Sequence, residues 1–236
     1  MTQTVSGETL MDKRVSTAPA VWRESLTIVW RHPVATLVPA LFLGALTELP
    51  YLFPDSRSLL QGVLAFLTES FAFYLYVAYA EELASEVRRS GRFIPLPRAL
   101  RSLLLAAPVV PLVTLASLAA ISLPTAAASV LVVPGLWLLT RWSLFAPVIV
   151  REHMGPLAAL RRSNELVRGR FELVFLTAVF AVVLEEAVMD AGAFGGLAIT
   201  GSETWGEWAG GSVAAVVILP AASFATALAY GALRRL

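Results

Sequence analysis

The chain has 236 residues, of which 57% are hydrophobic and only 15% are charged. Soluble domains contain roughly 45–50% apolar and about 25% charged residues, so this composition indicates an integral membrane protein and argues against a soluble enzyme. The net charge of +1 predicts no nucleic-acid partner, and the absence of cysteine excludes disulfides, thiolate catalysis and Cys-ligated metals.

Six apolar stretches are long enough to cross a membrane. A helix needs about 20 mainly apolar residues to span a hydrocarbon core of about 30 Å, and lipid cannot satisfy an unpaired backbone, so each stretch is predicted to be a helix. The spans are residues 33–53, 59–80, 102–123, 127–150, 171–191 and about 208–233. The predicted fold class is therefore all-α, a polytopic bundle of six transmembrane helices that forms one domain over residues 18–236. Residues 1–17 are polar and lack an apolar signal region, which predicts a disordered cytoplasmic tail.

The basic residues predict the orientation of the bundle. Sixteen of the 18 Lys and Arg residues lie before the first span, between spans two and three, between spans four and five, or after span six. Arg57 lies alone on the other side, and Arg141 lies within span four. Cytoplasmic loops are enriched in Lys and Arg, so we expect a multi-pass protein of the cytoplasmic (inner) membrane with both termini in the cytoplasm. On the opposite side only residues 192–207 form a loop longer than a tight turn.

The odd-numbered spans begin at Pro33, Ser102 and Phe171, which are 69 residues apart each time. A basic, partly apolar stretch precedes each of them. This spacing predicts three helical hairpins of the same orientation, each preceded by a cytoplasmic interfacial helix and related by an axis along the membrane normal. Residue identity between the units is poor, so a chance periodicity is the alternative.

The stretch before span five, residues 156–168, has the clearest interfacial pattern. On a helix its apolar residues share one narrow arc, which we expect to face the membrane; they are Leu157, Leu160, Val167 and Phe171. The candidate contacts to lipid headgroups are Arg161, Arg162 and Arg168. This pattern is typical of a helix that lies along a membrane surface, and it makes membrane lipids the predicted partners. A connector whose arginines only fix the topology is the alternative.

The segment 134–171 carries a pattern that extends beyond hydropathy. Its elements are Pro134-Gly135, Arg141 with Ser143 and Pro147, Glu152, Gly155-Pro156, and the run Ala159-Leu160-Arg161-Arg162-Ser163 followed by Arg168-Gly169. The pattern resembles the prokaryotic six-span membrane proteins known as the glycerophosphoryl diester phosphodiesterase membrane domain family, together with related membrane families. The resemblance covers 38 of 236 residues and implies a role in the cell envelope. That family takes its name from chains fused to a soluble phosphodiesterase domain. This sequence contains neither such a domain nor its His-Arg-Gly element, so phosphodiester hydrolysis is not implied.

Motifs for catalysis and cofactor binding are absent from the sequence. The two histidines, His32 and His153, are too few for a zinc site in a chain without cysteine. There is no serine-nucleophile elbow, phosphate-binding loop or dinucleotide motif. Glu185-Glu186 is similar to the Glu-Glu-x-x-x-Arg element of membrane proteases that process prenylated proteins, but Asp190 stands in place of that Arg. We therefore predict a protein that is not an enzyme and holds no metal or cofactor, with an intramembrane hydrolase as a distant alternative.

Acidic side chains inside the spans form the candidate polar site. A charge at the centre of a span costs about 2.5–3.5 kcal/mol, so such residues normally face the bundle interior or water. The candidate residues are Glu48, Glu69, Glu185, Glu186 and Asp190, with Arg141 as the basic member. Arg141 and Glu69 lie about one turn apart in depth, and we expect them to form a bidentate ion pair. The alternatives are that Arg141 reaches inward to phosphates and that the acids of span five reach headgroup-level water.

Two functions fit these observations. The first is a non-catalytic envelope protein with a scaffold or assembly role, which binds lipid and a protein partner or a second copy of itself. The second is a transporter or permease that uses the intramembrane carboxylates for a cation, an amine or a lipid-like solute. A scaffold predicts a filled bundle, whereas a transporter predicts a water-accessible cavity lined by the acids.

Overall fold

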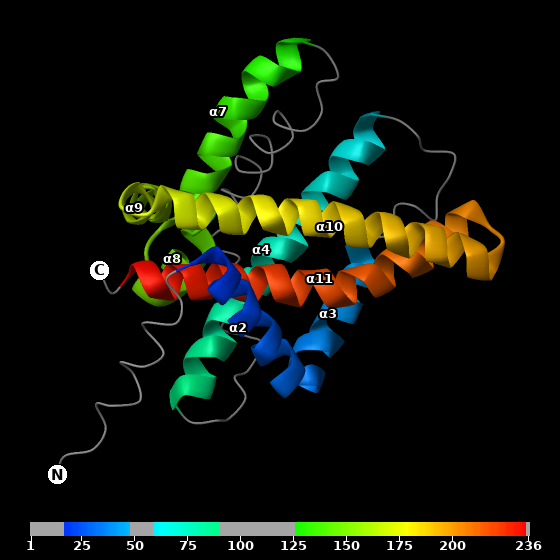
Figure 1. Cartoon of the computed structure of the whole chain (residues 1–236), viewed down its shortest axis with the longest axis horizontal. Coiled ribbons are helices and arrows are strands. Elements are labelled where there is room, and N and C mark those ends of the chain that lie inside the picture. Colours follow the sequence, from blue (N-terminus) through cyan, green and yellow to red (C-terminus); the bar gives the residue numbers. More distant parts are fainter. Residues whose placement is uncertain (1–16, 48–58, 90–125, 235–236) are drawn as a thin grey trace.

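The computed structural model describes residues 17–47, 59–89 and 126–234, and within these ranges the fold is all-α. The helices are α2 (Ala18–Arg31), α3 (Pro33–Thr47), α4 (Leu59–Arg89), α7 (Ala126–Trp142), α8 (Phe145–Glu152), α9 (Pro156–Arg168), α10 (Phe171–Thr200) and α11 (Glu203–Leu233). The helices α10 and α11 form a long hairpin (Figure 1), and α11 also packs against α2, α3, α4, α8 and α9. The predicted span 102–123 lies outside the described residues, as do residues 1–16 of the predicted tail.

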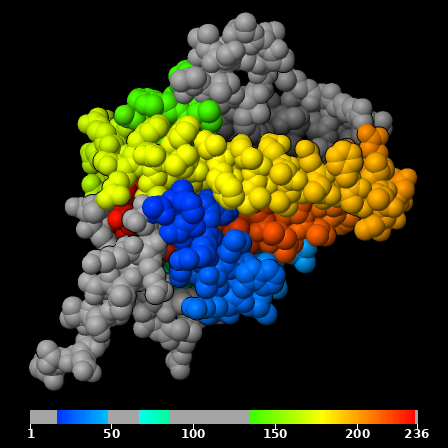
Figure 2. All heavy atoms as spheres, in the orientation of Figure 1, coloured from blue at the N-terminus to red at the C-terminus, as the bar shows by residue number. Residues whose placement is uncertain are grey.

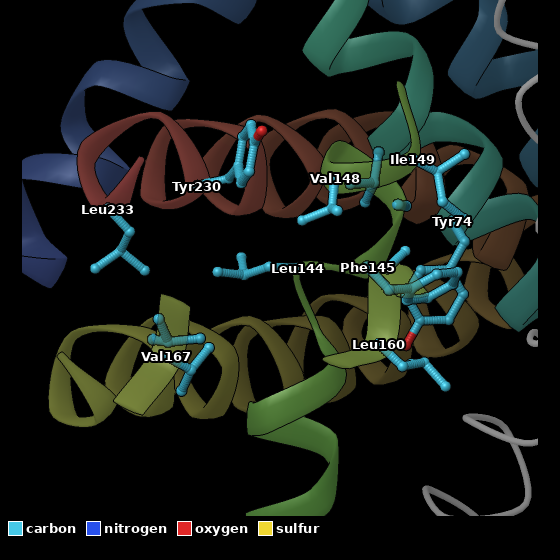
Figure 3. Close-up of a cluster of buried hydrophobic side chains, with 13 residues drawn as sticks. Tyr74, Leu144, Phe145, Val148, Ile149, Leu160, Val167, Tyr230 and Leu233 are labelled. Carbon is cyan, nitrogen blue, oxygen red and sulfur yellow. The ribbon is translucent and has the colours of Figure 1, made fainter. Parts of the chain in front are cut away.

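Buried apolar side chains join the helices at the C-terminal end of α11. Leu144 and Phe145, which begin α8, lie between residues from α4, α9 and α11 (Figure 3). The rings of Tyr74 and Phe145 are in contact, with their centroids 4.6 Å apart. Fully burying a large apolar side chain contributes about 1.5–3 kcal/mol, so this cluster holds α8 against the bundle although α8 is only 8 residues long.

Two helices replace the predicted span 127–150. The first, α7, ends at Trp142, and α8 begins at Phe145 after a short turn. An unbroken helix would need a hydrogen bond from residue 147 to the carbonyl of Ser143, which Pro147 cannot donate. In the first turn of a new helix the missing N–H of a proline is tolerated. The prediction of one continuous span was therefore wrong, and Arg141 lies in the last turn of α7.

The predicted loop 192–207 is mostly helical. The helix α10 continues through Thr200 and α11 begins at Glu203, so both helices extend beyond the predicted spans and a two-residue turn connects them. Gly201 has a left-handed φ of 65°, which glycine adopts without strain. Ser202 then caps α11 by accepting a hydrogen bond from the backbone N–H of Trp205.

Glycines bring the backbones of this hairpin into contact. Gly192 and Gly196 of α10 face Gly210 and Gly206 of α11, and a Cβ atom added at Gly196 would collide with the carbonyl oxygen of Gly206. Small residues at facing positions let two helices approach this closely. The four-residue spacing of these glycines in the sequence predicts close helix approach within the chain, and this prediction is confirmed.

A sharp bend separates α2 from α3, whose axes are inclined by 97°. The bend lies at His32, because a residue before proline disfavours the helical conformation, and Pro33 then starts α3. The starts predicted at Pro33 and Phe171 are confirmed as the first residues of α3 and α10, and a separate helix precedes each one. The predicted start at Ser102 lies outside the described residues.

Within the described residues, α11 alone is long and apolar enough to cross a membrane by itself. The helices α2 and α3 pass the same test as a pair but are bent. The acids Glu185, Glu186 and Asp190 interrupt the apolar sequence of α10, which is 30 residues long.

Gly195 and Gly196 offer a matched test of the hairpin contact. We expect Gly196→Ala to lower the free energy of unfolding by about 1–3 kcal/mol, the usual cost of overpacking, because the added Cβ meets the backbone of Gly206. Gly195→Ala should be neutral or stabilise by up to about 1 kcal/mol, since its Cβ would meet nothing within 4 Å and alanine favours helices. Unfolding of the purified protein in detergent measures both effects, and equal effects would contradict the contact.

Candidate functional site

Two carboxylates, Glu69 of α4 and Glu185 of α10, line one pocket where α3, α4, α10 and α11 meet. The pocket encloses about 340 Å³, the open space at its mouth included. The other lining residues are Thr47, Ala72, Phe73, Met189, Ala215, Ile218 and Leu219. The walls are therefore mainly apolar, and the polar groups are two acids and one hydroxyl.

Close packing of α3 on α11 forms one wall of this pocket. A Cβ atom at Gly44 would lie 2.7 Å from the Cβ of Ala215, so the contact depends on glycine at this position. The indole N–H of Trp208 donates to the carbonyl of Ala45 at 3.4 Å and joins the same two helices. The hydroxyl of Thr47 donates to the carbonyl of Gly44 at 2.9 Å, which leaves its oxygen able to accept a hydrogen bond or contact a cation.

Burial and neighbouring acids both act on the carboxyl groups of the pocket. Glu69, Glu185 and Glu186 lie close enough to repel one another. In the described part of the chain no basic side chain forms an ion pair with Glu69 or Glu185. A protonated amine or a monovalent cation between the two carboxylates would relieve this repulsion, most strongly where water is scarce. Among the described residues, no three His, Asp or Glu side chains are grouped so as to hold a metal ion.

Only part of the predicted polar site comes together here. Glu186 and Asp190 are exposed on α10, on positions that do not line the pocket. Glu48 lies outside the described residues. The structure thus brings Glu69 and Glu185 together from two helices that are far apart in sequence.

Arg141 does not pair with Glu69, and this prediction was wrong. Its guanidinium donates to Oδ1 of Asn164 on α9 at 2.7 Å and lies 3.9 Å from the ring centroid of Trp137. The hydroxyl of Ser163 donates to the backbone carbonyl of Arg141 at 2.7 Å. The prediction assumed one straight helix over 127–150, whereas the break after α7 brings its last turn to α9.

The predicted helix 156–168 is confirmed as α9, but its faces differ from the prediction. Leu160 and Val167, expected to face the membrane, lie in the protein core, while Leu157 is 71% exposed. Arg161 and Arg168 are exposed and free to contact headgroups. The remaining candidate, Arg162, is instead engaged within the protein, as described next.

A network of charged side chains joins four helices at the α8–α9 end of the bundle. Nε of Arg151 on α8 donates to Oε1 of Glu81 on α4 at 2.7 Å, and the two side chains are 22% and 7% exposed. The next residue, Glu152, accepts hydrogen bonds from Arg162 of α9 and from the hydroxyl of Tyr230 of α11, both at 3.1 Å. This network fixes α8 and α9 relative to α4 and α11.

The sequence analysis missed this network, although a signal for it existed. Glu81 directly follows the predicted span 59–80, and Arg151 directly follows the predicted span 127–150. The predicted topology places both residues at the same inner boundary, where opposite charges could meet. The contact of Tyr230 with Glu152 has no comparable signal, because a tyrosine in an apolar helix is ordinary.

Comparison of the chain with known protein families, with curated proteins and with solved structures finds no match.

The Arg151–Glu81 pair can be tested with a double-mutant cycle. We expect Arg151→Met to cost up to about 3–5 kcal/mol of stability, since it removes the ion pair of a buried carboxylate. The double variant with Glu81→Gln should lose less than the sum of the single losses, by about 0.5–3 kcal/mol. Chemical unfolding in micelles measures each term, with the exposed Arg161→Met as the control that should stay within about 0.5 kcal/mol of the parent. Additive single losses would show that the two residues are independent.

Proposed function

We propose that this protein is a non-catalytic integral membrane protein of the cell envelope, which crosses the cytoplasmic membrane six times with both termini in the cytoplasm. The observation that carries this proposal is the apolar outer surface of the described helices. The exposed large apolar residues are Val34, Val38, Leu41, Phe42 and Leu46 on α3, and Leu176, Phe180, Val183, Phe194, Leu197 and Ile199 on α10. Extensive exposed apolar surface of this kind is typical of proteins that contact lipid.

A scaffold or assembly role follows from the way the polar groups are used. At the α8–α9 end Arg151 binds Glu81, and Glu152 binds both Arg162 and Tyr230. These contacts hold the helices together. Buried polar groups in such a network serve packing and orientation, which supports a scaffold role. The proposed relationship to the six-span envelope family rests on the pattern at 134–171, which is the segment that builds α7, α8 and α9.

Membrane lipid is the proposed partner at α9. Arg161 and Arg168 are exposed on this helix, and Leu157 is exposed beside them. An apolar residue on the same helix face as two arginines suits the boundary between headgroups and acyl chains, and each basic residue near an anionic surface contributes about 1 kcal/mol.

The proposed topology can be tested with single cysteines, because the chain has none of its own. A cysteine at Ala158, exposed on α9, should resist a membrane-impermeant maleimide in intact cells and react after permeabilisation. A cysteine at Ala198, exposed near the end of α10, should react in intact cells. The opposite labelling would overturn the topology. Ser163 lies on the same helix as Ala158 but is fully buried, so a cysteine at that position would not report the topology.

The pocket favours a second candidate function, binding or transport of a small cation or amine. Two carboxyl groups, which have no basic partner among the described residues, face one cavity between apolar walls, and a scaffold does not require this feature. Transport would further need the pocket to open to each side in turn.

Carboxyl labelling separates the two functions. If the pocket is open to water, a water-soluble carbodiimide with a charged amine should modify Glu69 and Glu185. A saturating concentration of tetramethylammonium, a cation that cannot couple to an activated carboxyl, should protect both sites in mass spectra. The exposed Glu172 on α10 is the internal control, whose modification tetramethylammonium should leave unchanged. Full protection of Glu69 and Glu185 without any added cation would favour the filled scaffold.

A further inference from the structure

The helix α2 has one face attached to the bundle and one face free. The attached face includes Trp22, whose ring meets that of Phe180 on α10 edge to face at 4.9 Å. The hydroxyl of Ser25 donates to the backbone carbonyl of Ala221 on α11 at 2.6 Å. Trp22 and Ser25 are both buried, so α2 is held against the α10–α11 hairpin.

The free face of α2 combines basic and apolar side chains. Arg23, Leu26 and Trp30 follow one another at intervals of three and four residues, which places them on one side of the helix. Trp30 is 76% exposed and Leu26 is 41% exposed. Arg23 and Arg31 are also exposed. Tryptophan and arginine together on an exposed helix face are typical of the membrane–water interface.

The bend at His32 continues this face onto an apolar helix. Beyond it, α3 exposes Val34 at 73% and Val38 at 60%, with Phe42 further along. The two helices lie on the outer surface of the molecule, α2 beside α10 and α3 against α11 (Figure 2). Because their axes are inclined by 97°, a membrane that surrounds α3 would have its surface along α2.

We propose that the surface formed by Arg23, Leu26, Trp30, Arg31 and Val34, here called the elbow surface, binds the headgroup of an anionic phospholipid. This site is separate from the proposed contacts on α9. The inference rests on the proposed membrane location. The two guanidinium groups bind the phosphate, Trp30 lies at the level of the glycerol, and the acyl chains lie along α3 from Val34 onward.

The order of side chains along the bend favours lipid as the occupant. Guanidinium groups bind phosphate oxygens with paired hydrogen bonds, and the indole ring suits a boundary that is wet on one side and apolar on the other. The charged groups lie on α2, whereas the exposed face of α3 is apolar. This separation of charge and apolar surface across a right-angled bend matches a lipid, whose charge is confined to one end.

The test uses the full-length protein in phosphatidylcholine nanodiscs. The nanodiscs contain increasing amounts of a phosphatidylglycerol that carries bromine near the top of its acyl chains. Bromine quenches nearby indoles, and the Trp30→Phe variant supplies the background from the other five of the six tryptophans. We expect quenching that depends on Trp30. In the Arg23→Gln/Arg31→Gln variant the lipid concentration at half-quenching should rise about thirtyfold, at about 1 kcal/mol for each basic residue. Arg234→Gln, which removes an exposed arginine outside α2, should leave the curve within about threefold of the parent.

Three outcomes would overturn the elbow site. The first is quenching that does not depend on Trp30, and the second is an unchanged quenching curve in the Arg23→Gln/Arg31→Gln variant. The third is a shift in Arg234→Gln equal to that of the double variant, which would indicate general charge attraction. Brominated phosphatidylcholine quenching Trp30 as strongly as phosphatidylglycerol would also overturn the preference for an anionic headgroup. The cysteine labelling at Ala158 and Ala198 is independent of these variants, so failure of the elbow site is distinguishable from failure of the membrane topology.

Discussion

The described structure depends on how closely other helices can approach α11. Gly206 and Gly210 admit the backbone of α10, and Ala215 lies under Gly44 of α3. Further along, Ala221 accepts the hydrogen bond that fixes α2. In a membrane the hydrophobic effect gives little drive for helices to associate, so close van der Waals contact between small residues takes its place. The pocket, the long hairpin and the attachment of α2 all follow from this one packing surface.

Ion pairs complete the fold at the opposite end of α11 from the hairpin turn. At that end α11 meets the α8–α9 segment, which is held in place by contacts to Glu81, Glu152 and Tyr230. This arrangement gives a structural meaning to the pattern noted in the sequence at residues 134–171. Arg141 binds α9, Pro147 lies in the first turn of α8, and Glu152 joins α9 to α11. Each of these residues shapes a junction between helices, and none of these contacts requires a substrate.

The pocket and the elbow surface would serve different partners. The pocket presents two carboxylates inward, from α4 and α10, and suits a small positive group. The elbow surface presents two arginines and a tryptophan outward, and suits a negative headgroup. Both lie against α3, whose N-terminal end carries part of the elbow surface and whose C-terminal end carries Thr47 of the pocket. A protein that binds lipid at one end of this helix and a cation at the other would combine the two proposed functions.

The sequence by itself determined the all-α class, the starts of α3 and α10, and the bounds of α9, because hydropathy, prolines and spacing are local properties. It also singled out Glu69 and Glu185, since acids within apolar stretches stand out. Tertiary structure decided the rest. The spacing of the glycines at 192–210 indicated close helix approach, but that the residues between them continue both helices instead of forming a loop depends on the helix that each glycine faces. The partner of Arg141 depended likewise on the break after Trp142, which turned the end of α7 toward Asn164 and left Glu69 to face Glu185.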